Sequence, residues 1–339
     1  MLVLTLLPFI RSDAWWVRIF DFPRAQIAVI AAAVAAAYPF FVGAYGPARY
    51  AFLAALASCV VYQSYRMFPY TPLARRQVQQ SRRPREGSSL ALLFANVLME
   101  NRDASRLCEI IREADPDILL AIETDEWWQG QLMEFEESHP FTVLQPQGNT
   151  YGMLFYSRLE LVSAEVKFLV QDDIPSIHAR VRLASGQEVE LHCLHPRPPF
   201  PTEDERSTER DAELLIVGKA IKGKDDPVVV LGDLNDVAWS RTNDLFQHIS
   251  GLLDPRKGRG FYNTFHAKYP FIRFPLDHFF HSRHFRVADF RRLTYFGSDH
   301  FPVYIQLSYE PDAEAEQEKP RADESEKEEA RETIGKAVG

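Results

Sequence analysis

Polar side chains that can bind a metal ion stand directly after apolar segments in the middle of the chain. Asn96 ends the segment LALLFAN, Glu123 follows ILLAI, and Asp233 follows VVVLG. A buried carboxylate at a strand end is unfavourable unless it is paired or bound to a metal ion. Carboxylate oxygens are the preferred ligands of hard divalent cations. The three positions therefore predict an oxygen-rich cation site where several strands end.

Histidines and further polar residues occur at the same kind of position. They are His192, His195, Asn235, Asp236, Asp277, His278, Asp299 and His300. An imidazole can donate a hydrogen bond to a phosphoryl oxygen or transfer a proton. Alternation along a strand places His192 opposite His195 and His278 opposite Asp277, so we interpret His192 and His278 as structural residues. Asp236 is more typical of a turn.

Two arginines stand close to these residues in the sequence. Arg197 lies in HPRPP and Arg273 in RFPLDH. A guanidinium group can bind a phosphate through paired N–H donors, so both are candidate substrate-binding residues. A structural role is the alternative for each arginine. Asn96 has a comparable alternative, as a simple cap at the end of its strand.

Strands that alternate with a few helices must position these side chains. Residues 89–97, a helix at 103–114 and residues 117–123 form one β-α-β unit, and a longer helix is expected at 203–221. Further strand-like segments are 150–158, 159–169, 176–183, 188–195, 227–236, 274–282, 285–293 and 301–307. Many strands with few helices predict two packed sheets covered by helices, a layered α/β sandwich.

The first 70 residues are typical of a membrane anchor. Residues 25–43 contain no charged side chain, and residues 50–68 contain only Arg66. A membrane span needs about 20 apolar residues, so these segments predict a transmembrane helical hairpin. A buried hairpin of a soluble protein is the alternative.

Charge is distributed unevenly along the chain. Residues 1–89 contain ten arginines and three acidic residues, and most of the arginines flank the two apolar segments. The positive-inside rule then places both ends of the hairpin, and the domain that follows, in the cytoplasm of a cell (inner) membrane. Residues 71–89 are interpreted as a basic linker in contact with anionic membrane lipids.

The middle domain and the tail are acidic. Residues 90–309 contain 23 basic and 33 acidic residues, a net charge of −10. Such a domain is poorly suited to binding a nucleic-acid backbone, which usually requires a basic surface. Residues 310–339 carry a net charge of −6 and are predicted to be disordered or a loose solvated helix.

The order of the motifs resembles that of a known superfamily. The motifs are NV at 96–97, IE at 122–123, HPRPP at 195–199, GDLND at 232–236, LDH at 276–278 and GSDH at 297–300. Together they resemble the endonuclease/exonuclease/phosphatase superfamily over residues 90–308, as a membrane-anchored bacterial-type member. This superfamily includes nucleases similar to deoxyribonuclease I, abasic-site endonucleases, neutral sphingomyelinases and inositol-polyphosphate phosphatases.

The resemblance implies a four-layer α/β sandwich with two packed mixed sheets and a site at the sheet edge. It also implies a Mg²⁺ or Mn²⁺ ion, with Glu123 as the main ligand. Asn96 would be the hydrogen-bonding neighbour of that ligand, and Asp299 would be a second metal contact.

The resemblance assigns catalytic roles to five further residues. Asp233 would orient or deprotonate the attacking water, and Asn235 would place that water and the phosphate. His300 would donate to the phosphoryl oxygens, and Asp277 would fix the tautomer of His300. His195 would be the other catalytic histidine.

These observations predict a metal-dependent phosphoric ester hydrolase, either a phosphodiesterase or a phosphatase, anchored to a membrane. The abasic-site endonucleases carry a tyrosine in the region of His195, so a DNA-repair role is less expected. Lipid or small-molecule phosphate esters are favoured over nucleic acid as substrates, and the sequence indicates no protein partner. A metal-dependent nuclease and a catalytically silent membrane-bound scaffold are the alternatives.

Overall fold

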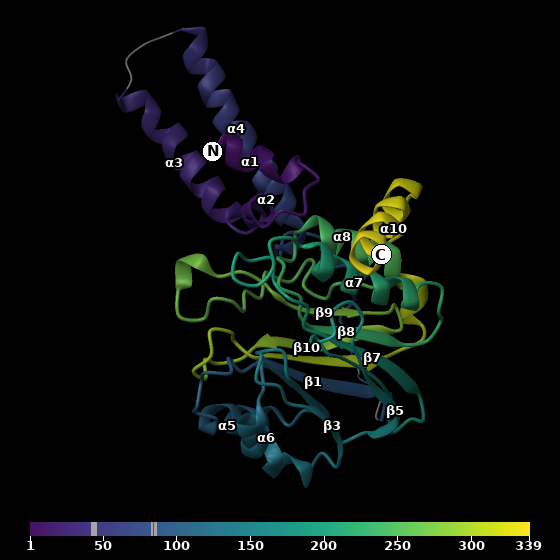
Figure 1. Cartoon of the computed structure of the whole chain (residues 1–339). Coiled ribbons are helices and arrows are strands. Elements are labelled where there is room, and N and C mark those ends of the chain that lie inside the picture. The colour runs from purple at the N-terminus through teal and green to yellow at the C-terminus, as the bar shows by residue number, and fades with distance from the viewer. Residues whose placement is uncertain (42–45, 83, 85–86) are drawn as a thin grey trace.

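A computed structural model of the chain describes residues 1–41, 46–82, 84 and 87–339. A helical hairpin near the N-terminus stands away from a domain of strands and helices (Figure 1). The C-terminal helix lies on that domain, beside α7 and α8 (Figure 1).

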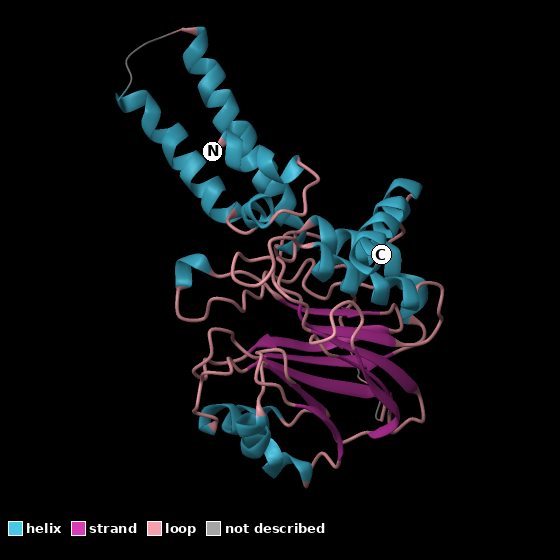
Figure 2. Cartoon of the chain, in the orientation of Figure 1, coloured by secondary structure: helices cyan, strands magenta, loops and turns pink. Residues whose placement is uncertain are grey.

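Eleven strands are present in the described residues, and they form two sheets that pack face to face (Figure 2). The first sheet has the strand order β10-β11-β1-β2-β4-β3, and the second has the order β5-β6-β7-β8-β9. β1 runs parallel to β2, and β7 runs parallel to β8, whereas the neighbouring pairs are antiparallel. Both sheets are therefore mixed, as predicted. The strands are β1 (Ser89–Asn96), β2 (Ile118–Ile122), β3 (Phe141–Gln145), β4 (Met153–Ser157), β5 (Glu160–Lys167), β6 (Ser176–Arg182), β7 (Glu188–Leu194), β8 (Val228–Asp233), β9 (Asp277–His281), β10 (Phe285–Arg292) and β11 (Val303–Tyr309).

Helices cover the outer face of each sheet. Leu92 and Phe94 of β1 point into the core between the sheets, while Leu93 and Ala95 point towards α5 (Ser105–Ala114) and α6 (Glu126–Leu132). A strand that is buried on both faces is expected to be apolar at consecutive positions, as β1 is. α7 (Thr208–Ile221) and α8 (Arg241–Ser250) cover the second sheet. The order helix, sheet, sheet, helix agrees with the expected layered sandwich.

Some elements differ from the prediction. The β-α-β unit is present as β1, α5 and β2, but β3, α6 and α8 were not predicted. The helix expected from residue 203 begins at Thr208, because residues 205–207 instead bond to residues 13–15 near the N-terminus.

The hairpin consists of α3 (Arg24–Phe41) and α4 (Pro47–Met67), which pack through Ala31, Leu56 and Cys59. Among the described residues, α3 is the one helix that is long and apolar enough to cross a membrane, and 22% of it is buried. The prediction of two spans is therefore not supported, because the last turns of α4 contain polar residues such as Gln63 and Arg66. Residues 42 and 43, at the end of the first predicted span, lie outside the described residues.

Short helices flank the hairpin. They are α1 (Leu2–Leu6), η1 (Leu7–Phe9), α2 (Trp15–Arg18) and η2 (Ile19–Asp21) before it and η3 (Phe68–Tyr70) after it. The domain also contains η4 (Met133–Glu136) and η5 (Pro270–Ile272).

The linker and the tail pack on the domain. Val78 is fully buried in the core between the sheets, and Gln80 pairs with Val287, so residues 71–82 do not form a free linker. In the tail, α9 (Ala313–Glu316) precedes α10 (Glu324–Val338), and Ala330 of α10 packs against Leu215 of α7. The tail is thus a packed helix, where the sequence predicted disorder or a loose helix. Its acidic residues are compatible with a helix because they lie mainly on the solvent face.

Candidate active site

The polar residues at the strand ends meet at one edge of the two sheets. Asn96 ends β1 in the first sheet, and Asp233 ends β8 in the second. The amide Nδ2 of Asn96 donates to Glu123 Oε1 at 2.7 Å and to Asp233 Oδ2 at 3.3 Å. Asn96 Oδ1 accepts from the backbone N–H of Leu98 at 3.1 Å. Asn96 therefore connects two carboxylates through its nitrogen, which favours a positioning role over direct metal ligation.

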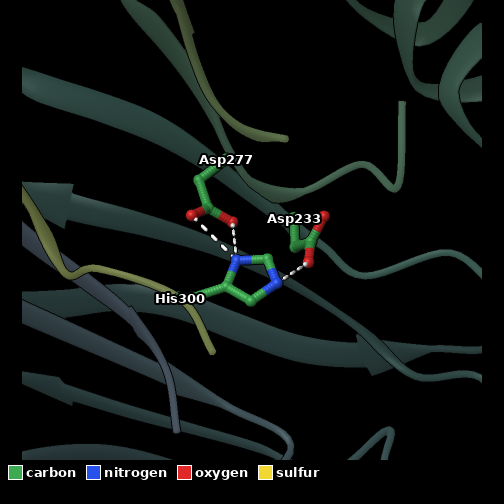
Figure 3. A group of neighbouring side chains, drawn as sticks. All are labelled: Asp233, Asp277 and His300. Atoms are coloured by element: carbon green, nitrogen blue, oxygen red, sulfur yellow. Dashed lines mark hydrogen bonds and ion pairs between the residues drawn. The ribbon is translucent and has the colours of Figure 1, made fainter. Parts of the chain in front are cut away.

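His300 lies between two aspartates (Figure 3). Its Nδ1 is 3.2 Å and 3.1 Å from the two carboxylate oxygens of Asp277, and its Nε2 is 3.5 Å from Asp233 Oδ2. Asp233 and Asp277 are register partners on the antiparallel strands β8 and β9, so the sheet itself places them together. All three side chains are buried. The predicted pairing of Asp277 with His300 is present in the structure.

The charges of these groups depend on one another. Burial by itself lowers the pKa of His300, but Asp277 and Asp233 raise it to about 10, so the imidazole is protonated and both ring nitrogens are donors. Burial raises the pKa of Glu123 to about 7 and raises that of Asp233 as well. Several buried carboxylates thus share one cationic side chain, and this excess of negative charge suits a bound cation.

The backbone at Glu123 adopts an uncommon conformation. Its φ is 58°, in the left-handed region that non-glycine residues rarely occupy. Gly152 lies against this turn: a Cβ at residue 152 would be 1.8 Å from the carbonyl oxygen of Thr124. Such conformations cost about 1–3 kcal/mol and are concentrated at functional sites. The close approach of Gly152 permits the turn that directs Glu123 to the sheet edge.

Asn235 also has a left-handed backbone, with φ 51°, in the loop that follows β8. Its backbone N–H donates to Asp233 Oδ1 at 2.8 Å, and its Nδ2 donates to the carbonyl of Pro196 at 3.0 Å. Asn235 therefore joins the GDLND loop to the HPRPP loop. Because Nδ2 is occupied, Oδ1 is the atom of the Asn235 amide that can accept a hydrogen bond from a water molecule.

His195 follows β7 and is buried beside the ring of Tyr151, with centroids 5.2 Å apart. Burial lowers the pKa of His195 to about 3, and His300 contributes to that shift, so the ring is neutral. Within the described part of the chain, His195 Nδ1 has no hydrogen-bond partner. A neutral imidazole beside a protonated one can accept a proton or a hydrogen bond.

Asp299 is partly exposed beside His300, and its carboxylate accepts a 3.4 Å hydrogen bond from Ser298 Oγ. Among the described residues, neither Asp299 nor Glu123 has an ion-pair partner. The ligand atoms of Asp233, Asp277 and His300 lie within 4.8 Å of one another and form a second possible cation site. Both carboxylates of that trio already contact His300, which favours Glu123 and Asp299 for the metal.

The two candidate arginines differ. Arg197 pairs with Asp173 at 2.6 Å, so its guanidinium group is already engaged. Arg273 donates through Nη2 to the carbonyl of Ala267 at 2.8 Å and lies over the ring of Phe301, 4.9 Å from its centroid. The Nε atoms of both arginines lack a hydrogen-bond partner among the described residues, but Arg273 contacts no carboxylate there, so its charge is not neutralised as that of Arg197 is. Because Phe301 directly follows His300, the structure favours Arg273 as the phosphate-binding arginine.

The two histidines that we interpreted as structural are engaged away from the reaction centre. His192 contacts His178 through a 2.6 Å bond between their Nδ1 atoms. His278 contacts Arg256 at 2.7 Å and the carbonyl of Asp236 at 2.8 Å.

The sequence interpretation missed two supporting residues. Ser298 Oγ donates to the carbonyl of Asn96 at 2.8 Å and accepts from the N–H of His300 at 3.0 Å. Arg210 of α7 donates to the carbonyl of Asn235 at 2.7 Å and to Asp236 at 3.0 Å. The GSDH motif contained a signal for Ser298, whereas no local pattern marks Arg210.

Comparisons with known proteins agree with this geometry. Residues 93–300 match the Endonuclease/Exonuclease/phosphatase family, and no curated protein matches the chain in sequence. The fold is similar to D. rerio TDP2 complexed with a single-strand DNA product, with 20% identity, a TM-score of 0.55, and 65% of this chain and 99% of that chain covered. It is also similar to an endonuclease/exonuclease/phosphatase from Beutenbergia cavernae, with 18% identity, a TM-score of 0.54, and 66% and 72% covered. The human Nocturnin catalytic domain with bound sulfate has 17% identity and a TM-score of 0.52, with 67% and 96% covered.

At these identities the solved structures show a shared fold, and the family match carries the assignment. That match covers more than half of the chain and includes each of the strand ends described above. The chain therefore belongs to the endonuclease/exonuclease/phosphatase family, whose members are hydrolases acting on phosphate esters.

Proposed function

We propose that this protein is a divalent-metal-dependent hydrolase of phosphate esters that is anchored to a membrane. The observation that carries the proposal is the placement of His300 between Asp277 and Asp233. Asn96 connects Asp233 to the carboxylate of Glu123 through hydrogen bonds to both. Asp277 holds the protonated imidazole in place, so that His300 can donate a hydrogen bond to a phosphoryl oxygen. Asp233, whose pKa is raised by burial, can accept a proton from the attacking water.

The residues present fit a magnesium or manganese ion. Glu123 and Asp299 would hold it, and Asn96 would fix the orientation of Glu123 through the 2.7 Å hydrogen bond. When bound, such an ion stabilises the negative charge that develops on the phosphoryl oxygens. The protein supplies the remaining stabilisation through the donors of His300 and Arg273, which act in a water-poor site.

We favour a lipid or small-molecule phosphate ester as the substrate. The net charge of −10 on residues 90–309 opposes binding to a nucleic-acid backbone. A metal-dependent nuclease remains the second candidate, supported by the similarity of the fold to a TDP2 structure that holds a DNA product. A silent scaffold is disfavoured because every acid and histidine of the family pattern is present.

Membrane anchoring is supported by the surface of the hairpin. Phe40 and Phe41 of α3 are 87% and 86% exposed, and Val61 of α4 is 68% exposed. Exposed apolar surface of this extent is unfavourable in water and suits a bilayer. The arginines on the flanks favour an orientation that places the hydrolase domain in the cytoplasm.

An activity panel on the whole chain in detergent tests the proposal. The substrates are plasmid DNA, RNA, phospholipids, inositol phosphates and generic aryl phosphomonoesters and phosphodiesters, each with Mg²⁺, Mn²⁺ or excess EDTA. We expect metal-dependent hydrolysis of a phosphate ester that His300→Ala slows by about 10²-fold or more. Preferred hydrolysis of DNA or RNA would support the nuclease instead. Inactivity on every substrate with both metals would reject the enzyme.

A further inference from the structure

An exposed apolar loop lies beside the active site. Residues 268–272, which include η5, are all exposed. Phe271 is 88% exposed, and Tyr269 and Ile272 are 55% and 48% exposed. Three large apolar side chains on one short loop are costly in water unless another apolar phase or partner receives them.

The residues that directly precede the loop contact the reaction centre. The backbone N–H of Ala267 donates to the carbonyl of Asp299 at 2.6 Å. The ring of Phe265 lies 5.0 Å from the ring of His300, and the two residues form a β-bridge. A movement of this loop would therefore displace contacts of Asp299 and His300, two residues of the proposed site.

The loop itself contacts the base of the hairpin. Gln26, in the first turn of α3, donates through Nε2 to the carbonyl of Phe271 at 2.8 Å. In Figure 1 the short helix of this loop, drawn in green, lies just below the base of α3. The loop thus lies beside the first turn of α3, where that helix would enter a membrane.

The segments that directly flank the hairpin are docked on other loops near the active site. Phe22 packs edge-to-face on Phe274, with centroids 5.5 Å apart, and Tyr70 OH donates to the carbonyl of Ala238 at 2.5 Å. Trp239 Nε1 donates to the carbonyl of Asp21 at 2.7 Å. Because these contacts hold the domain on the hairpin, the distance between the active site and a membrane around α3 is fixed by packing.

We propose that residues 268–272 insert into the interface of the membrane that holds the hairpin and that the active site accepts a phosphate ester carried on a membrane lipid. This inference rests on the proposed function, and it selects lipid esters over soluble small molecules. Aromatic side chains are typical of the bilayer interface, and the exposed Lys268 on the same loop can contact anionic headgroups. The occupant of this surface is therefore a bilayer that contains anionic phospholipid.

Basic side chains lead from the loop to His300. Arg273 directly follows the loop, and Arg292 lies over the same Phe301 ring, 4.3 Å from its centroid. Burial lowers the pKa of Arg292, and the positive charge of Arg273 lowers it further. Both guanidinium groups donate to backbone carbonyls, Arg273 to Ala267 and Arg292 to Asn263, and neither has a carboxylate partner among the described residues. A lipid phosphate that enters from the loop would supply an anion for these two positive charges.

A fluorescent probe tests insertion without requiring turnover. The three native cysteines are buried, so Phe271→Cys can be labelled selectively with an environment-sensitive nitrobenzoxadiazole group. In the whole chain reconstituted into vesicles of phosphatidylcholine and phosphatidylglycerol, we expect a blue-shifted emission that spin-labelled lipids quench. Phe141→Cys is the matched control, because Phe141 begins β3 at the strand end opposite to Glu123. Emission from position 271 that matches this control would overturn the insertion.

Turnover tests the substrate class. We measure hydrolysis of phosphatidylglycerol and phosphatidic acid in vesicles and of a soluble aryl phosphodiester. The vesicle-to-soluble rate ratio should fall by about tenfold or more in Phe271→Ser, because the loop loses the apolar ring that the bilayer would bury. Phe141→Ser should keep the wild-type ratio. Hydrolysis of the soluble ester without any hydrolysis of vesicle lipid would overturn the substrate class alone. Inactivity on all esters would overturn the proposed function, and the probe would still decide insertion.

Discussion

The Asp277–His300 pair allows a quantitative test of the site. Both carboxylate oxygens of Asp277 are within 3.2 Å of His300 Nδ1, and the Asp277 side chain is fully buried. Asp277→Asn replaces one of these oxygens with an N–H donor, and the single remaining acceptor no longer carries a charge. His300→Ala removes the donor to the phosphate entirely. The test compares the two single variants with the double variant.

The expected losses follow from the contacts. Loss of a general acid or of an electrostatic donor reduces turnover by about 10²–10³, which is about 3–4 kcal/mol in the barrier. Because Asp277 acts through His300, the double variant should lose no more activity than His300→Ala. Stability should show a different pattern. His300→Ala leaves Asp277 and Asp233 buried without their cation and should cost about 3–5 kcal/mol, part of which Asp277→Asn should restore.

The measurements are kcat/KM on a soluble phosphate ester and urea-induced unfolding of all four proteins. His139→Ala is the control, because this buried histidine contacts the carbonyl of Pro116 and no residue of the site. Losses of activity that multiply in the double variant would refute the reasoning. Asp277 would then be better interpreted as a ligand of a cation held with Asp233 and His300, whose ligand atoms lie within 4.8 Å.

Three further predictions concern the metal, an ion pair of α2 with the domain, and the removal of the N-terminal segment. Glu123→Gln keeps the size of the side chain but removes its charge. We therefore expect at least about 10²-fold lower turnover and, by calorimetry, weaker Mg²⁺ binding, with the fold retained. Wild-type turnover that is undiminished in excess EDTA would contradict this prediction. Arg18 lies 3.3 Å from Asp236, and Asp236 also contacts Arg210. Arg18→Ala should therefore lower the free energy of unfolding by about 1–3 kcal/mol in chemical denaturation, which is less than the loss of an only partner would cost. Removal of residues 1–70 should destabilise the domain further, and a truncated domain as stable as the whole chain would show that the docking contacts contribute nothing.

The layers of the fold could be predicted because strands and helices leave different periodic patterns. Consecutive apolar residues in 90–95 indicate a strand buried on both faces, and this is how β1 is placed. α8 was missed although Ser240 and Gly251 mark its ends, since Ser240 Oγ accepts from Asn243 N–H and Gly251 has φ 75°. α6 has seven residues, too few for a clear helical period.

The site could be predicted to the extent that its residues stand at strand ends. β8 and β9 are neighbours in one sheet and β1 belongs to the sheet packed against it, so Asn96, Asp233 and Asp277 meet at one edge even though the chain separates them widely. Arg210 could not be predicted in this way, because it acts through a carbonyl oxygen of a distant loop and leaves no sequence pattern. Arg197 was predicted from its neighbours in HPRPP, but the sequence does not show that Asp173 is its partner.

The docked hairpin changes the interpretation of the charges. The sequence suggested that the arginines of residues 71–89 contact membrane lipids, that the arginines beside the apolar segments set the orientation in the membrane, and that the acidic domain is poorly suited to nucleic acid. In the structure, Arg18 pairs with Asp236 and Arg66 pairs with Asp244 at 3.0 Å, so part of the positive charge near the hairpin neutralises part of the negative charge of the domain. These arginines are less available to lipid headgroups than their number implies. The pair of Arg18 with Asp236 connects α2 to the loop that follows β8, and the pair of Arg66 with Asp244 connects α4 to α8. The N-terminal segment therefore contributes to the architecture around the active site as well as to any contact with a membrane.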